Sequence, residues 1–201
     1  MAETFQLPEG IAIDDVSGLK SAYTDNGDGN ISAVVSAEKL CGLIAELTAL
    51  LPEPAFFFIE LPCDAEDEKK LGGGKPLYKL YYLDNCTKNV ISALVSEYGD
   101  MLVNDGLVRF GFGGNESGDE IYIQTYKVMS IYCSEDGLCR KTKALLEKYG
   151  AVPESELVTP WDVISPENPA VCAVTEEDGI TAADLPEMLK KAGMYFADNV
   201  E

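Results

Sequence analysis

The sequence contains no histidine among its 201 residues. This absence excludes serine–histidine and cysteine–histidine nucleophilic pairs, imidazole metal ligands and the ordinary protonation switch between about pH 5 and 8. Catalysis would have to rely on carboxylates, lysine, tyrosine, cysteine or a bound metal. A non-enzymatic role is therefore the first prediction.

Basic residues are scarce as well. The chain has 15 lysines and arginines against 35 aspartates and glutamates, so its net charge is −20. Self-repulsion of this size favours solubility and opposes binding to phosphate backbones and anionic lipid surfaces, so neither nucleic acid nor membrane is a predicted partner. A basic protein is the predicted partner, because opposite fields accelerate encounter. The alternative interpretation is a solvated acidic surface without a binding role.

Long apolar runs and metal-type cysteine spacings are also missing. No apolar run approaches the ~18 residues that span a bilayer. Residues 1–10 lack the basic start and the apolar stretch of a secretory signal, which predicts a cytoplasmic protein. The six cysteines include no CxxC pair. They are predicted to be small buried hydrophobes that stay reduced, with a Cys133–Cys139 disulfide as the alternative.

Two loops match ligand-binding motifs only in part. Asp25–Gly29 fits several positions of a calcium loop, but the first carboxylate and the bidentate glutamate of that loop are missing. Its turn residues predict a hairpin instead. Gly72–Lys75 lacks the spacing of a phosphate loop, and Pro76 blocks the helix that should follow, so a hairpin tip is predicted. We therefore predict no metal site and no cofactor.

The fold class is predicted as α+β. Apolar residues make up 46% of the chain, and one domain over residues 1–201 is expected. Residues 19–136 would form a core of hairpins and helices, and residues 137–201 a third helix, an irregular segment and a C-terminal helix packed on it. Within the central stretch Lys75–Asp136, the pattern indicates a strand over 77–83, a helix capped by Thr87 and ended by a left-handed Gly106, a strand over 107–113, a turn over 115–118 and a long strand over 119–133.

The other elements follow from the same rules. They are a hairpin of 19–24 with 30–36, a helix from Ser36 to Pro52, a strand over 55–61, a helix over 138–149, an edge segment around Pro160, a strand over 170–174, and a last helix opened by a Thr181–Asp184 capping box and closed by Gly193. Trp161 is predicted to fill a gap in the core. The tail 194–201 is predicted to fray.

Apolar positions recur at a spacing of about 50 residues, which predicts a repeating helix–hairpin unit. Leu40 corresponds to Ile91, and Phe57 corresponds to Val108. If the crossovers are right-handed, the helices pack mainly on one face of a mixed, largely antiparallel sheet. The other face would then be covered by residues 150–200 or by a partner.

Tyrosines are the predicted anchors of such a partner. The long strand over 119–133 places its isoleucines on one face and its tyrosines on the other, and tyrosine suits a half-wet face because its ring buries while its hydroxyl keeps a polar contact. Acidic loops would form the rim. The predicted partner-binding residues are Tyr78, Tyr82, Tyr122, Tyr126, Tyr132, Asp64, Glu66, Asp67, Glu116, Asp119 and Glu120. The alternative is ordinary packing of these tyrosines beneath residues 150–200.

Three functions are compatible with these patterns. The first is a non-enzymatic acidic protein-binding module, such as an immunity or inhibitor-type protein that occludes a basic partner. The second is an enzyme that uses carboxylates or a divalent metal near the Gly111–Glu120 turn. Because neighbours in a strand point to opposite faces, Asp119 and Glu120 cannot both aim at one substrate there. The third is an accessory subunit of a larger assembly. The sequence favours the first.

Overall fold

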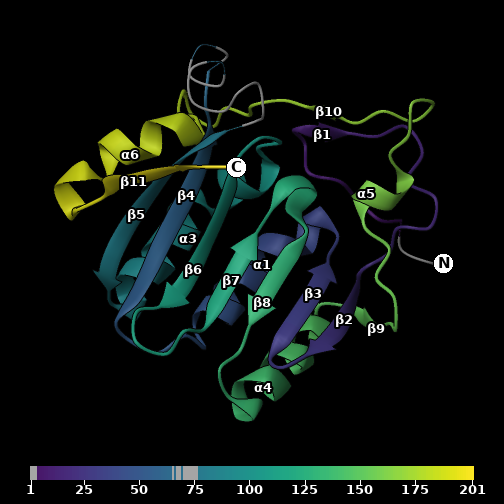
Figure 1. The fold of residues 1–201 in the computed structure, drawn as a ribbon, viewed down its shortest axis with the longest axis horizontal. Helices are drawn as coiled ribbons and strands as arrows, with labels where there is room; N and C mark the ends of the chain where they lie inside the picture. Colours follow the sequence, from purple (N-terminus) through teal and green to yellow (C-terminus); the bar gives the residue numbers. More distant parts are fainter. Residues whose placement is uncertain (1–3, 65, 67–68, 70–76) are drawn as a thin grey trace.

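A nine-stranded sheet forms the body of the protein (Figure 1). The structure is a computed structural model that describes residues 4–64, 66, 69 and 77–201. Across the sheet the strands are β11 (Tyr195–Val200), β5 (Tyr78–Cys86), β4 (Ala55–Pro62), β6 (Arg109–Gly114), β7 (Glu120–Ile123), β8 (Met129–Tyr132), β3 (Asn30–Val34), β2 (Ala22–Gly27) and β9 (Val152–Pro153). Every neighbouring pair is antiparallel except β2 with β9, which is parallel. The predicted mixed, mostly antiparallel sheet is confirmed.

The described residues contain five α-helices. They are α1 (Ala37–Thr48), α3 (Lys88–Asn104), α4 (Asp136–Lys148), α5 (Pro160–Val163) and α6 (Leu185–Met188), with short 3-10 turns at Thr125–Lys127, Ala182–Asp184 and Lys190–Ala192. Figure 1 shows α1 and α3 behind the sheet. The structure confirms the α+β class, whereas the recurrence of a 50-residue unit stays a prediction. No helix within the described ranges is both long enough and apolar enough to cross a bilayer.

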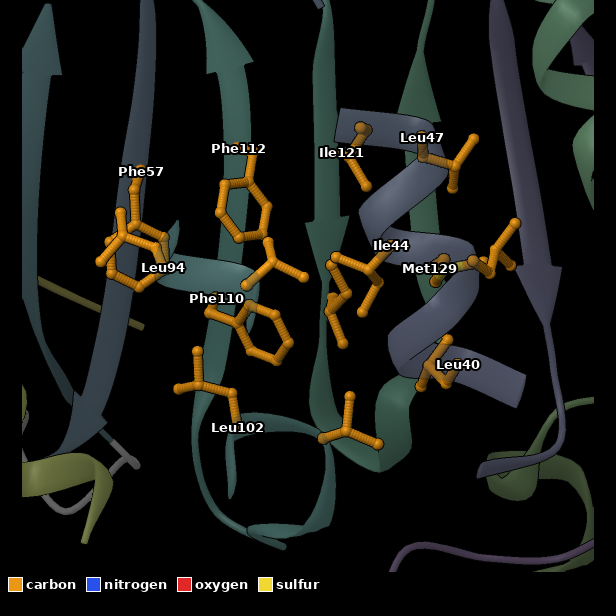
Figure 2. Close-up of a cluster of buried hydrophobic side chains, with 14 of the residues drawn as sticks. Leu40, Ile44, Leu47, Phe57, Leu94, Leu102, Phe110, Phe112, Ile121 and Met129 are labelled. Carbon is orange, nitrogen blue, oxygen red and sulfur yellow. The ribbon is translucent and has the colours of Figure 1, made fainter. Parts of the chain in front are cut away.

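The main core lies between the sheet and the helices α1 and α3. Figure 2 shows side chains of the helices meeting side chains of the central strands. The labelled residues are Leu40, Ile44 and Leu47 of α1, Leu94 and Leu102 of α3, Phe57 of β4, Phe110 and Phe112 of β6, Ile121 of β7 and Met129 of β8, and all are buried. Fully burying an aliphatic or phenylalanine side chain contributes about 1.5–3 kcal/mol. This layer therefore supplies most of the hydrophobic stabilisation, and it fixes which face of the sheet remains free of these helices.

A second, two-stranded sheet lies at one end of the molecule. It pairs β1 (Ile11–Ala12) with β10 (Val171–Cys172), and Gly10 and Gly106 approach each other closely beside it. A side-chain carbon on Gly106 would lie 2.0 Å from the carbonyl oxygen of Gly10. The predicted left-handed end of α3 at Gly106 is wrong, because α3 ends at Asn104, the capping residue Asp105 is extended, and Gly106 has no positive φ. Glycine is needed there for close approach of two backbones.

The predicted long strand over 119–133 is two strands. β7 ends at Ile123, residues 124–128 reverse the chain, and β8 begins at Met129. Tyr126 and Lys127 adopt positive φ in this turn, at 57° each. The prediction that one face of this segment is apolar is confirmed, because its apolar residues are all buried in the core: Ile121, Ile123, Met129 and Ile131.

The C-terminal third differs more from the prediction. Residues 195–200 do not fray but form the edge strand β11. Pro160 opens the short helix α5 behind a Thr159–Asp162 capping box, where an edge segment was expected. Trp161 does not fill the core, since 57% of it is exposed. The capping box at Thr181 and the left-handed Gly193 are confirmed. Cys133 and Cys139 are not bonded to each other, so the alternative Cys133–Cys139 disulfide is wrong.

Candidate protein-binding surface

A row of aromatic rings crosses the sheet face opposite to α1 and α3. Residues directly opposite in antiparallel strands share a face, and the registers connect one continuous line across eight strands. In order from β11 to β2 the line reads Tyr195, Tyr82, Phe58, Gly111, Tyr122, Ser130, Ser32 and Thr24. We call its four rings, Tyr195, Tyr82, Phe58 and Tyr122, the aromatic row. The first five positions carry these four rings and Gly111, and the last three carry small hydroxyl side chains.

Neighbouring rings of the aromatic row touch. Tyr195 stacks on Tyr82 with ring centres 6.4 Å apart. Phe58 lies 5.7 Å from Tyr82 and 5.3 Å from Tyr122. Phe56, two residues before Phe58 in β4, has its ring centre 5.6 Å from that of Tyr82 and 6.2 Å from that of Phe58. Offset and tilted pairs at such distances contribute about 0.5–1.5 kcal/mol each beyond the area they bury. The rings therefore hold one another in place.

Two glycines of β6 make room for the rings of β4. A side-chain carbon on Gly111 would lie 2.4 Å from the ring of Phe58, and one on Gly113 would lie 2.3 Å from the ring of Phe56. Both rings therefore lie across the backbone of β6. Phe58 is buried by this arrangement, while Tyr82 and Tyr122 remain half-buried. The sequence pattern F-G-F-G over 110–113 is explained by alternation: Phe110 and Phe112 face the helices, and Gly111 and Gly113 face the aromatic row.

A buried ion pair fixes the position of Tyr122. Glu60 of β4 accepts a hydrogen bond of 2.8 Å from the Tyr122 hydroxyl, and the same carboxylate oxygen lies 2.5 Å from Arg109 Nε. The Arg109 guanidinium lies 3.6 Å from the centre of the Tyr78 ring. Burial, and then the Glu60 carboxylate, raise the pKa of Tyr122 above its usual value. Tyr122 is thus a neutral donor held by a charged acceptor.

Acidic groups surround the other rings. Burial raises the pKa of the Glu120 carboxyl, and the nearby Glu60 raises it further. Burial and then Glu120, Glu60 and Asp84 raise the pKa of Tyr82. Asp84 accepts a hydrogen bond of 2.6 Å from the Tyr195 hydroxyl. The charged groups around the aromatic row thus include three carboxylates, Glu60, Glu120 and Asp84, and the Arg109 guanidinium.

Four of the five predicted tyrosines lie on this face, and three of them lie close together. Tyr82 and Tyr122 belong to the aromatic row, and Tyr78 packs on Arg109 beside it. Tyr132 lies on the same face, two residues after Ser130 in β8. It pairs with Glu120 and Asn30 and is 43% exposed. Tyr126 does not join them, because the turn between β7 and β8 carries it against Trp161, with ring centres 4.6 Å apart.

The predicted acidic residues are more scattered. Asp64 and Glu66 are exposed beyond the end of β4, Asp67 lies outside the described residues, and Glu116 is exposed in the β6–β7 turn. Glu120 shares the face of the aromatic row. Asp119 is buried, and its Oδ1 accepts hydrogen bonds of 2.7 Å from both the backbone N–H and the hydroxyl of Ser134. Gly72–Lys75, predicted as a hairpin tip, also lies outside the described residues.

A hollow of about 340 Å³ lies beside the β6–β7 turn. Its lining includes Ser117 and Asp119 of this turn, Ser134 and Glu135 just before α4, and Lys141 within α4. Asp119 and Glu120 do not converge on it, since Glu120 lies on the face of the aromatic row and is not part of the lining. Within the described ranges, no three cysteine, aspartate or glutamate side chains gather closely enough to hold a metal ion.

Sequence reasoning missed the residues that complete the surface. Phe56, Phe58 and Glu60 alternate along β4, and the alternation in A-F-F-F-I-E-L already places them on one face. Tyr195 was missed because the tail was predicted to fray. Arg109 and its pairing with Glu60 have no local signal, since the two residues are 49 positions apart. Comparisons with protein-family models, with curated proteins and with solved structures found no match.

Proposed function

We propose that this chain is a non-enzymatic, acidic protein-binding module that occludes a basic partner through the aromatic row. The observation that carries the proposal is the set of touching rings on the sheet face opposite to α1 and α3, with acidic groups among them. The same surface would serve an accessory subunit of a larger assembly. A cytoplasmic location is part of the proposal.

Tyrosines make good anchors for such a partner. A tyrosine supplies a large rigid contact area and a hydroxyl that keeps a hydrogen bond when buried, and such residues are enriched among those that carry binding energy. Tyr195 and Tyr132 are the most exposed tyrosines of this face, at 47% and 43%. They would lose the most water-accessible surface on binding. Tyr82 and Tyr122 would form the better-packed centre.

Charge determines which partner is favoured. At a net charge of −20 the chain attracts basic proteins at long range and repels acidic ones. Glu120 and Asp84 would place negative charge directly among the rings. Arginine and lysine side chains fit such a surface, because they form ion pairs with carboxylates and also pack on tyrosine rings.

A capture experiment tests the proposal. Immobilised wild-type protein is incubated with native lysate at low salt, alongside a Tyr132→Ala/Tyr195→Ala variant and a Trp161→Ala control. Trp161 is also an exposed aromatic residue, but it packs on Tyr126 away from the row. We expect a basic protein on the wild type and on the control, and its loss from the double variant. Recovery of no basic protein, or equal recovery by all three, would refute the proposal.

The hollow beside the β6–β7 turn is the one observation that favours the carboxylate enzyme as a second candidate. A ligand that binds only the folded protein raises its melting temperature. Divalent cations and small metabolites are therefore screened by thermal shift, with an Asp119→Asn variant as control. A rise of several degrees in the wild type that the variant lacks would place this candidate first.

A further inference from the structure

The strand β11 forms one edge of the nine-stranded sheet. It is six residues long and pairs with β5 alone among the strands that the structure describes. Residues 195–198 are all exposed. The opposite edge is formed by β9, which is only two residues long. An edge strand presents unpaired backbone N–H and C=O groups that can pair with another chain.

Aromatic side chains lie on both sides of this edge. Tyr195 stacks on Tyr82 on the face of the aromatic row. Phe196 points to the other face and packs edge-on against Tyr81, with ring centres 5.6 Å apart. Tyr195 and Phe196 are 47% and 50% exposed. Side chains of an added strand would alternate between the two faces and would meet a ring on each.

The edge favours pairing with a basic segment over pairing with a second copy of this chain. A bulge at Ala197 interrupts the pairing with β5, and the exposed Asp198 follows it. Bulges and charged side chains are devices that keep edges from pairing with copies of themselves. Two copies of this chain would bring two charges of −20 together. A segment rich in lysine or arginine meets no such repulsion, and it gains attraction from the same acidic groups.

We propose that an extended basic segment of the partner pairs with β11 as an additional strand of the sheet. This proposal rests on the proposed function and specifies its mode of recognition. Backbone hydrogen bonds to β11 would align the segment. Its side chains on one face would continue the aromatic row, and those on the other would reach Phe196. Lysine or arginine at alternate positions would face Asp198 and the carboxylates that lie beside the aromatic row, such as Asp84 and Glu120.

The test uses three fluorescently labelled peptides at low salt. The first has the sequence Lys-Val-Lys-Val-Lys-Val-Lys. The second has the same side chains with every internal amide N-methylated, so it keeps the charge but loses the backbone donors. The third replaces each lysine with glutamate. We expect the first peptide to bind, the second to bind at least tenfold more weakly, and the third not to bind. Hydrogen exchange of the amides in residues 195–200 should slow when the first peptide binds.

Two protein variants locate the binding. Asp198→Lys and Glu156→Lys change the net charge equally, but Glu156 is exposed just after β9, at the opposite edge of the sheet. We expect Asp198→Lys to weaken binding of the first peptide several-fold more than Glu156→Lys does. Three results each overturn the proposal: no binding of the first peptide, equal binding of the N-methylated peptide, or equal effects of the two variants. If the capture experiment still recovers a basic protein through the aromatic row, only the strand pairing is refuted and the proposed function stands.

Discussion

Replacing Lys127 with methionine should change how the stability of the protein depends on pH. Lys127 lies in the turn between β7 and β8 and is only 3% exposed. Its Nζ donates a hydrogen bond of 2.8 Å to the carbonyl oxygen of Val108 and lies 5.6 Å from the ring centre of Phe110. Burial lowers the pKa of Lys127 from 10.5 to about 7, although the nearby Asp105 and Cys172 oppose this change.

The sign follows from the protons that each state binds. Between about pH 7 and 10.5 the unfolded chain keeps the Lys127 proton and the folded protein does not, so the free energy of unfolding rises with pH in this window. Below about pH 7 both states are protonated, and the folded protein bears the full cost of a buried charge. One pKa unit corresponds to about 1.4 kcal/mol. Between about pH 6 and 9, Lys127 should therefore contribute roughly 2–3 kcal/mol of added stability on going to the higher pH.

Urea denaturation of wild type and Lys127→Met at about pH 6 and 9 measures this contribution. Other groups also titrate in this range, but their effects cancel when the two proteins are compared at each pH. Loss of the hydrogen bond to Val108 adds a cost that does not depend on pH. We expect the wild type to gain about 2–3 kcal/mol on the variant between the two pH values. Lys141→Met removes an exposed lysine of α4 and controls for the loss of one charge. A gap between wild type and Lys127→Met that stays constant with pH would refute the reasoning.

Three further predictions concern the sheet and its turn. Gly111→Ala should lower the free energy of unfolding by about 1–3 kcal/mol in urea denaturation, because the added carbon would lie 2.4 Å from the Phe58 ring. The control Gly137→Ala, which has open space around the added carbon, should not lower the free energy of unfolding. Glu60→Gln should lower the pKa of Tyr122, because it removes the carboxylate that accepts its hydrogen bond, and it should also lower the pKa of Tyr82. Ultraviolet titration of the tyrosines should therefore shift to lower pH, and an unchanged curve would contradict the assigned contact. Asp119→Ala should cost about 1–3 kcal/mol through the loss of its two hydrogen bonds with Ser134; Glu116→Ala in the same turn is exposed and should stay within about 0.5 kcal/mol of wild type in the same assay.

Alternation along the strands could be predicted because it depends on nearest neighbours only. The pattern of β4 and β6 gives the buried face correctly, and the turn residues mark the hairpins at Asp28–Gly29 and at 115–118. The turn between β7 and β8 could not be predicted. It contains no glycine, proline or asparagine, and its positive φ values fall on Tyr126 and Lys127, which rarely adopt them. The face assignment survived because Ile123 pairs with Met129 across an odd number of turn residues, which preserves the alternation.

The edge strand shows a different limit. Nothing in Y-F-A-D-N-V distinguishes a strand from a frayed tail, because its partner β5 lies more than 100 positions earlier in the chain. The register that aligns the aromatic row could not be predicted for the same reason, because the row joins strands from distant parts of the sequence. Bulges in β11 and β5 shift the pairing by one residue, which changes the face of every residue beyond them. The sequence could therefore suggest that tyrosines share a face, but not which rings touch.

The buried ion pair distinguishes the two faces of the sheet. On the side of α1 and α3 the central strands carry a large apolar core, with Lys127 as a buried charged group at Phe110. On the other side Glu60 and Arg109 are paired with little exposure to water. A buried ion pair often stabilises less than apolar residues of the same volume, but it does fix geometry. Here the pair orients Tyr122 through its hydroxyl and Tyr78 through its ring. Side chains that are fixed before a partner binds lose less conformational entropy on binding. A binding surface gains affinity from such fixed side chains, whereas a second apolar core layer would not need a buried ion pair to orient its tyrosines.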